Sequence, residues 1–178
     1  MKRSLTVLAL CLAATGLTRT QRASAQAEAP PTAREIVVAY NVGSRFSIAP
    51  GIFIPRDGQR VGFSIAGDYR YGIELGPVVL APGVRLSGFF PSQFVALSAL
   101  GTARLTVPLG PVGPYVMGGV GPGYVSKPAE PGLAFMGGGG LMVYVGQAFA
   151  IGAEATYLGI TGTRFRALFI GPSLLLGF

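Results

Sequence analysis

The stretch that decides the fold is FSIAGDYRYGIEL, residues 63–75, because it places three charges inside an otherwise apolar run. On a helix, at about 100° per residue, Asp68 and Arg70 would lie on nearly opposite sides and no apolar stripe would remain. On a strand, side chains alternate between two faces. Asp68, Arg70 and Glu74 then share one face, while the aromatic and aliphatic side chains share the other. The pattern therefore predicts a strand.

The same alternation recurs between turn residues along the rest of the chain and predicts eight strands. Each strand with its connection takes about 17 residues, and a tilted strand that crosses a bilayer needs ~9–11. The expected strands are residues 45–54, 61–75, 79–90, 94–107, 115–125, 133–145, 149–160 and 164–178.

The composition predicts that the outside of this sheet faces lipid. Half of the residues are hydrophobic and 12% are charged, whereas an ordinary soluble domain has ~25% charged residues. A sheet in lipid must close, because its edge groups would find no hydrogen-bond partner there. The predicted fold class is therefore all-β, a closed eight-stranded antiparallel up-and-down transmembrane β-barrel.

Three other folds remain as alternatives. Residues 133–153, LAFMGGGGLMVYVGQAFAIGA, are long enough for a transmembrane helix, but each of the four consecutive glycines would weaken it by roughly 1 kcal/mol relative to alanine. The polar face could instead project into water from an open sheet. A soluble secreted barrel with an internal ligand is the third alternative.

The N-terminus has the pattern of a cleavable signal peptide. Lys2 and Arg3 precede an apolar run at about residues 5–17, and Ala23-Ser24-Ala25 offers a cleavage site. The run is shorter than the roughly 18 residues of a spanning helix, which disfavours an uncleaved anchor. The expected organisation is a signal peptide (1–25), a periplasmic lead-in (26–44) and the barrel (45–178). Residues 35–40 have strand character that does not fit the eight strands.

The polar face is expected to line the lumen. Three acidic and three basic residues share it, and buried charges cost several kcal/mol each unless they are paired. Arginine suits this role because its planar fork holds carboxylates in bidentate pairs. The expected lumen ion-pair network is Asp68, Arg70, Glu74, Arg85, Arg104 and Glu154.

Aromatic residues are expected to form two girdles at the membrane interfaces, as in other barrels. The inner girdle is predicted to contain Tyr69, Tyr71, Tyr115, Tyr144, Phe149 and Phe178. The outer girdle is predicted to contain Phe63, Phe89, Phe90, Phe94, Tyr124 and Tyr157.

Most catalytic chemistry is missing from the sequence. The chain has no histidine, and its one cysteine, Cys11, lies in the signal segment. A Ser-His-Asp triad, a thiol nucleophile and an ordinary zinc site are thereby excluded, so the prediction is not an enzyme, with no cofactor and no metal. Removal of the signal leaves ten basic and seven acidic residues, which is weak evidence for nucleic acid; no nucleic-acid or specific small-molecule partner is predicted.

The chain resembles the small OmpA-like outer-membrane β-barrel proteins of Gram-negative bacteria. The resemblance covers residues 45–178 and rests on the eight-strand rhythm, the stretch GPVGPYVMGGVGPGY (110–124) and the ending GPSLLLGF. It implies a location in the outer membrane, with lipid as a partner. It also implies an assembly signal at Leu174, Leu176 and Phe178 that the barrel-assembly machinery reads, although Pro172 and Gly177 depart from the pattern.

The leading functional hypothesis is an outer-membrane barrel with a structural or surface-interaction role. Eight strands enclose an interior just wide enough for side chains, so the lumen is expected to be filled. The alternatives are a narrow pore or small hydrophobic-ligand conduit, and a soluble secreted barrel that carries a ligand.

Overall fold

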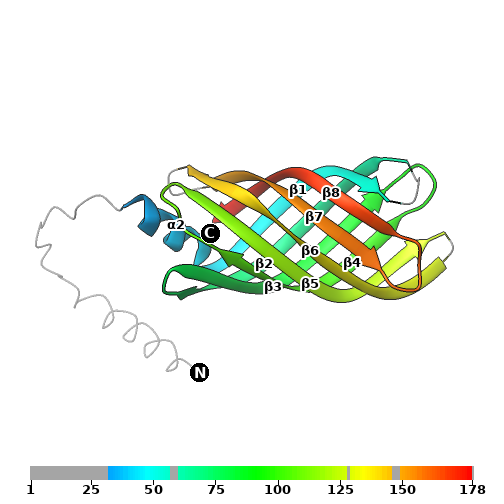
Figure 1. The fold of residues 1–178 in the computed structure, drawn as a ribbon, viewed down its shortest axis with the longest axis horizontal. Coiled ribbons are helices and arrows are strands. Elements are labelled where there is room, and N and C mark those ends of the chain that lie inside the picture. Colours follow the sequence, from blue (N-terminus) through cyan, green and yellow to red (C-terminus); the bar gives the residue numbers. More distant parts are fainter. Residues whose placement is uncertain (1–31, 57–59, 128, 146–148, 178) are drawn as a thin grey trace, which may run out of the picture. The chain divides into compact units, whose positions relative to one another are not determined.

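The chain forms a closed barrel of eight antiparallel strands in which each strand pairs with the next and β8 pairs with β1 (Figure 1). This confirms the predicted fold class. The computed structural model describes residues 32–56, 60–127, 129–145 and 149–177. The strands are β1 (Gly43–Pro55), β2 (Gly62–Leu75), β3 (Val78–Phe90), β4 (Ala96–Thr106), β5 (Val112–Ser126), β6 (Ala129–Val145), β7 (Phe149–Ile160) and β8 (Arg166–Gly177).

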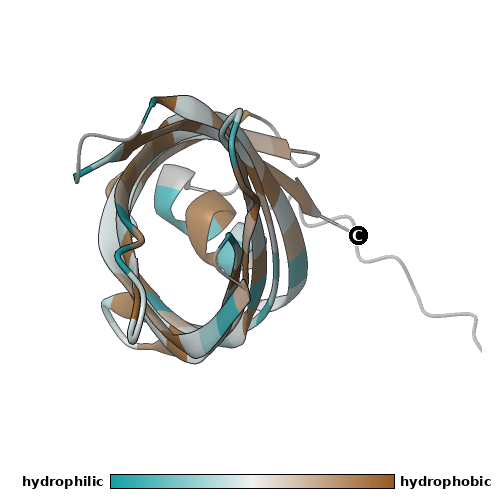
Figure 2. Ribbon diagram, turned by 90° about the vertical axis from the view of Figure 1, so that its right-hand side faces the viewer, coloured by the Kyte–Doolittle hydropathy of each residue, from teal (hydrophilic) through white to brown (hydrophobic). Residues whose placement is uncertain are grey.

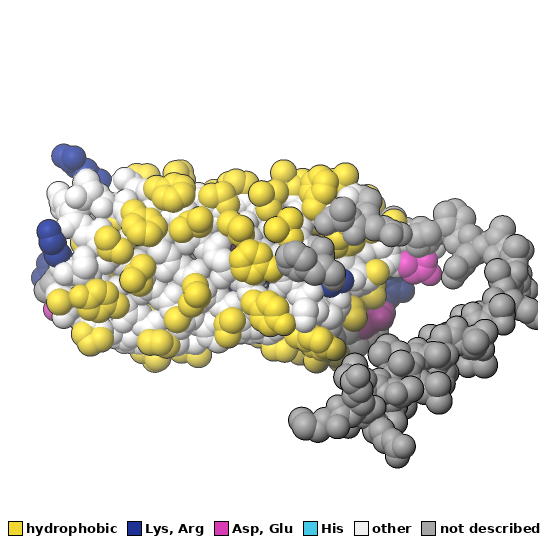
Figure 3. Space-filling model, turned by 180° about the vertical axis from the view of Figure 1, so that it is seen from behind, with side chains coloured by type: hydrophobic (Ala, Val, Ile, Leu, Met, Phe, Trp, Pro, Cys, Tyr) yellow, Lys and Arg dark blue, Asp and Glu magenta, His cyan; other side chains and the backbone are white. Residues whose placement is uncertain are grey.

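Residues 63–75 sort their side chains as a barrel strand should. Asp68 and Arg70 are buried inside, whereas Tyr69 and Tyr71 are 53% and 56% exposed on the outer wall. Apolar side chains are spread over the whole length of that wall (Figure 3). The strand alternative is thereby confirmed for this segment.

The segment that could have been a transmembrane helix is strand β6 followed by the start of β7. Its glycine run serves close packing, since the Tyr115 ring of β5 lies against Gly140, where an added Cβ would meet the ring at 2.7–2.8 Å. Within the described ranges, no helix is long and apolar enough to cross a membrane.

The expected loop at residues 126–132 is mostly strand. Val125 pairs with Glu130, and Ser126 pairs with Ala129, so the β5–β6 hairpin extends almost to its tip. The proline at position 131 suggested a loop. It is tolerated because its pairing with Tyr124 is at a position where the two strands exchange no backbone hydrogen bond.

Residues 33–41 form a helix, α2 (Ala33–Asn41), so the expectation of strand character at residues 35–40 was wrong. Thr32 and Glu35 form a capping box, in which each side chain accepts a hydrogen bond from the backbone N–H of the other residue. The β-branched residues 36–38 suggested a strand, but the capping box just before them starts a helix that continues through them.

Helix α2 closes one end of the barrel. Val37, Tyr40 and Asn41 are buried, and the view along the barrel shows α2 within the ring of strands (Figure 2). The Asn41 amide donates to the Tyr144 hydroxyl at 2.5 Å, and the rings of Tyr40 and Tyr144 lie 5.4 Å apart. We call this the helix end, and the opposite end, with the β1–β2, β3–β4, β5–β6 and β7–β8 connections, the loop end.

Two further features hold α2 in place. The Arg45 guanidinium donates to the carbonyl oxygens of Tyr40 and Ala39 at 2.5 and 2.6 Å, and a cation there satisfies the carbonyls at the end of the helix. Gly72 of β2 admits the helix terminus, since an added Cβ would collide with the Asn41 carbonyl.

The seam between the first and the last strand lacks two backbone hydrogen bonds at its centre. Ile48 pairs with Leu174 and Ile52 with Ile170, so Pro50 lies opposite Pro172. Even-numbered residues of β1 form backbone hydrogen bonds with β8, and the next chain position beyond β1 shows the same pattern: the Arg56 N–H donates to the Arg166 carbonyl at 2.9 Å. Proline has no N–H, and the pairing of β1 with β8 is accordingly interrupted at residues 49–51 and 171–173.

Replacing both prolines by valine (Pro50→Val with Pro172→Val) should therefore stabilise the barrel. Each restored hydrogen bond also gives a partner to a carbonyl in apolar surroundings, which stabilises the fold by about 1–3 kcal/mol. This gain exceeds the ~0.4–1 kcal/mol by which proline stabilises a fold through its stiffness in the unfolded chain. The free energy of unfolding in urea, measured in vesicles, should rise.

The matched control is Pro131→Val. Pro131 is exposed, like Pro172, but the pairing of β6 with β7 starts only at Ala134, so valine there gains no ladder hydrogen bond. Equal effects of the seam and control variants would contradict the seam argument.

Candidate functional site

The centre of the bore holds an ion triad of Asp68, Arg85 and Glu154. The Arg85 Nη1 lies 3.1 Å from Asp68 Oδ2, and its Nη2 pairs with Glu154 Oε1. Arg85 Nε donates to Ser87 Oγ at 3.4 Å, and the Tyr115 hydroxyl donates to Glu154 Oε2 at 3.1 Å. Both carboxylates are therefore committed to Arg85.

Register explains why these three residues meet. Asp68 of β2 lies directly opposite Arg85 of β3, and cross-strand neighbours on one face are within side-chain reach. Glu154 comes from β7, on the far side of the barrel, so its bond to Arg85 crosses the bore. The triad is a bridge across the lumen as well as a charge pair.

The other two predicted arginines lie in the bore but outside this triad. Arg70 donates from Nη1 to Ser47 Oγ at 3.0 Å. Arg104 donates from Nε to Thr106 Oγ1 at 3.2 Å, and its guanidinium carbon lies 3.4 Å from the centre of the Tyr115 ring. This distance allows a cation–π contact.

Glu74 was predicted in the lumen network and lies outside it. Its side chain is exposed near the last residues of β2, two positions before Gly76. The parity of Glu74 matches that of Asp68 and Arg70, but Glu74 is the penultimate residue of β2, and at this end of the strand its side chain is exposed. The buried charges of the described bore are therefore three arginines and two carboxylates, not three of each.

Four predicted girdle residues face the wrong way for a girdle. Tyr115, Tyr144 and Phe89 are buried inside the barrel, and Phe94 packs against that core. They were assigned by height along the strands, and height does not decide the face. For Phe89 the sequence does indicate the inward face, because Phe89 alternates in step with Arg85 and Ser87, which were predicted to be on the polar face.

The remaining described girdle residues lie on the outer wall. Tyr69, Tyr71 and Phe149 are exposed toward the helix end, and Phe63, Phe90 and Tyr124 toward the loop end. Tyr157 is half-buried against Phe135. Phe178 lies outside the described residues. Of the expected assembly signal, Leu174 and Leu176 face outward, and Leu175 between them is buried.

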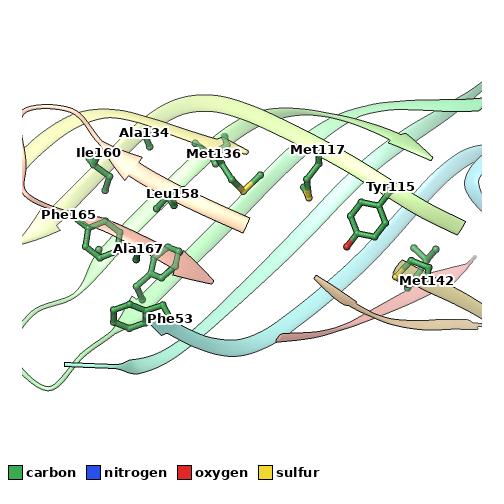
Figure 4. Packing of buried hydrophobic residues seen from close by; sticks show 14 of the residues in the cluster. Phe53, Tyr115, Met117, Ala134, Met136, Met142, Leu158, Ile160, Phe165 and Ala167 are labelled. Carbon is green, nitrogen blue, oxygen red and sulfur yellow. The ribbon is translucent and has the colours of Figure 1, made fainter. Parts of the chain in front are cut away.

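Inward-facing aromatic rings close the loop end of the bore. Phe53 packs edge-on to Phe89 at 5.6 Å, and Phe165 contacts Phe89 and Phe94 at 5.4 and 6.0 Å. Figure 4 shows Phe53 and Phe165 side by side with Leu158 and Ile160 nearby. Sequence analysis missed this cluster, since Phe53 and Phe165 were assigned no site and Phe89 and Phe94 were assigned to a girdle.

A shallow pocket lies above this aromatic cluster at the loop end. It measures about 390 Å³ and is lined by Phe94, Val125, Lys127, Glu130, Arg164 and Phe165 among others. Charged side chains thus stand around an apolar floor.

The loop end is basic. Five exposed cations lie in its connections or beside them, against Glu130 as the acidic residue among those described; the sequence adds Asp57. Basic side chains are visible at that end of the barrel in Figure 3. The cations are Arg56, Arg60, Lys127, Arg164 and Arg166.

The triad predicts an asymmetric response to substitution. Arg85→Met leaves two buried carboxylates without a cation, which should lower the free energy of unfolding by about 3–5 kcal/mol. Adding Asp68→Asn and Glu154→Gln removes the stranded charges and should restore most of the loss. Urea unfolding of the folded barrel measures both effects, with Glu74→Gln as the exposed control.

Comparison with known proteins identifies the fold through structure. No family model matches the sequence, and no curated protein matches it. The solved structure of Neisserial surface protein A (NspA) superposes with a TM-score of 0.57 at 14% identity, covering 76% of this chain and 96% of that one.

Two further solved structures have the same fold. Ail, the attachment invasion locus protein of Yersinia pestis, gives a TM-score of 0.53 at 17% identity, covering 76% of this chain and 99% of that one. The outer membrane enzyme PagL gives 0.52 at 12% identity, covering 75% and 99%.

PagL corrects one prediction. The chain was expected not to be an enzyme, because it has no histidine and its one cysteine lies in the signal segment. That inference was wrong, because an outer membrane enzyme has this fold. The comparisons show the fold of small eight-stranded barrels and do not single out the OmpA-like proteins. The chain thus combines an apolar outer wall with the fold of these small outer-membrane β-barrels.

Proposed function

We propose that this chain is a closed barrel that binds an anionic partner at the cell surface through its basic loop end. The observation that carries the proposal is the cluster of five exposed cations at that end. Clustered charge of one sign attracts and orients an oppositely charged partner. The pocket of about 390 Å³ beside Lys127 and Arg164 gives such a partner a place to settle.

The orientation in the membrane belongs to this proposal. Outer-membrane barrels have short periplasmic turns and longer extracellular loops. The connections at the helix end span two, five and three residues, and those at the loop end span six, five, two and five, so the loop end has the longer connections on average. The helix end would then face the periplasm, and the basic end the exterior.

The bore supports a surface role over a pore. Helix α2 closes the helix end, the triad spans the middle, and aromatic rings fill the loop end. The cavity beside the triad measures about 10 Å³, which is at the lower limit for one water molecule. A hydrophobic-ligand conduit would need far more room.

Two expectations from the sequence remain predictions. The signal peptide covers residues 1–25, which lie outside the described residues. Leu174, Leu176 and Phe178 are expected to be read by the barrel-assembly machinery.

Binding to a sulfated polysaccharide tests the surface role. The protein in micelles should bind immobilised heparin at low salt, and Arg56→Gln, Arg60→Gln, Arg164→Gln and Arg166→Gln together should weaken binding by about tenfold or more. Each exposed ion pair contributes ~0.2–1 kcal/mol, and 1.4 kcal/mol is a factor of ten. Raising the salt concentration should reduce binding by the unmodified protein.

A matched pair of single variants locates the surface. Arg60→Gln removes a cation at the loop end, and Arg34→Gln removes one from α2 at the helix end. Arg60→Gln should weaken binding more. Equal losses, or a quadruple variant that binds like the unmodified protein, would exclude the loop end as the binding surface.

Conductance in planar bilayers tests the closed bore separately. The unmodified protein should carry no steady ion current, and Arg85→Ala with Arg104→Ala should still carry none, because α2 and the aromatic rings keep the two ends of the bore closed. A steady current through the unmodified protein would favour the narrow pore instead.

A further inference from the structure

The bore carries an excess positive charge. Among the described residues its buried charged groups are Arg70, Arg85, Arg104, Asp68 and Glu154. Arg85 is bound by both carboxylates, so Arg70 and Arg104 have no carboxylate in hydrogen-bond contact within the described chain. An unpaired buried charge costs several kcal/mol, and the surrounding lipid raises that cost.

The two arginines also have unused hydrogen-bond donors. Arg70 Nε and Nη2 and Arg104 Nη2 are buried and make no hydrogen bond to the part of the chain that the structure describes. Arg70 and Arg104 are only 4% and 3% exposed. Nε and Nη2 form one edge of the guanidinium plane, and that edge matches two oxygens of one oxyanion.

The register places the two arginines on either side of one strand. Arg70 lies opposite Gly83 of β3, and Arg104 lies opposite Ala81 of the same strand. The two arginines therefore flank β3 from either side, with small residues between them. An added Cβ on Gly83 would meet the Arg70 Cβ at 2.8 Å.

We propose that Arg70 and Arg104 hold one small oxyanion, of the size and charge of sulfate or phosphate, inside the bore above Ala81 and Gly83. The free edge of Arg70 binds two of its oxygens, and Arg104 Nη2 binds a third. The anion neutralises the cationic excess. It lies apart from the loop end, so this site is independent of the proposed surface function.

The anion is enclosed as the barrel closes. The three unpaired nitrogen atoms are inaccessible to solvent, and α2 and the triad close the bore on either side. Binding needs a shift of at least one guanidinium group, because Arg70 itself lies against Gly83. Slow exchange with the solvent follows.

Refolding in defined anions tests the site. The full chain is refolded into micelles with sodium sulfate, or with the sodium salt of a bulky sulfonate at equal ionic strength, and then exchanged into volatile buffer. Native mass spectrometry should find one sulfate retained per barrel, and the sulfate-refolded protein should melt at a higher temperature than the sulfonate-refolded one.

Variants assign the anion to these residues. Arg70→Met and Arg104→Met should each lose the retained sulfate and the sulfate-dependent shift in melting temperature. Arg60→Gln, an exposed arginine at the loop end, should keep both. If Arg70→Met does not fold, Arg70→Lys keeps the charge but lacks the two-nitrogen edge, and it should fold without retaining sulfate.

Three results would overturn the proposal. The first is no retained sulfate together with equal melting temperatures in sulfate and sulfonate. The second is retention that persists in the Arg70 and Arg104 variants. The third comes from a further refolding in sodium chloride at the same ionic strength: full stabilisation there, with no sulfate retained in the sulfate sample, would exclude an oxyanion.

Discussion

The structure depends on one constraint: in lipid, backbone N–H and C=O groups must find their partners within the chain. Closure of β8 on β1 meets this constraint for the sheet as a whole. Closure in turn creates an inside that is cut off from water, so polar side chains must be satisfied there by one another. The bridge from Asp68 and Glu154 to Arg85 follows from that requirement.

The interior is layered along the barrel axis. Aromatic rings fill the loop end, ions fill the middle, and α2 with Tyr40 and Tyr144 fills the helix end. Apolar layers on both sides keep water from the ions, which strengthens their attraction and makes an unpaired charge expensive. The excess positive charge of Arg70 and Arg104 is therefore costly where it lies.

Side-chain alternation predicted much of the fold and part of the site. It placed Asp68, Arg85 and Glu154 on one face, and the structure brings them together. It did not predict which side chains near a strand end stay buried, because that depends on strand tilt and stagger, and so Glu74 was misplaced. Tyr115 and Tyr144 lie in strands where glycine hides the alternation.

Helix α2 shows a different limit of sequence reasoning. The Thr32-x-x-Glu35 pattern of a capping box was present in the sequence. The β-branched run Ile36-Val37-Val38 favoured the competing interpretation as a strand. What decided the outcome was the barrel mouth, which offers Val37 and Tyr40 a place to be buried.

The short link between α2 and β1 has a mechanical consequence. Val42 alone separates Asn41 at the end of the helix from Gly43 at the start of the strand. Tension on the N-terminal segment would therefore reach β1 almost undiminished, as shear against β8. Two ladder bonds are absent from the middle of that contact, so under load the barrel should rupture there before it peels at any other pair of strands.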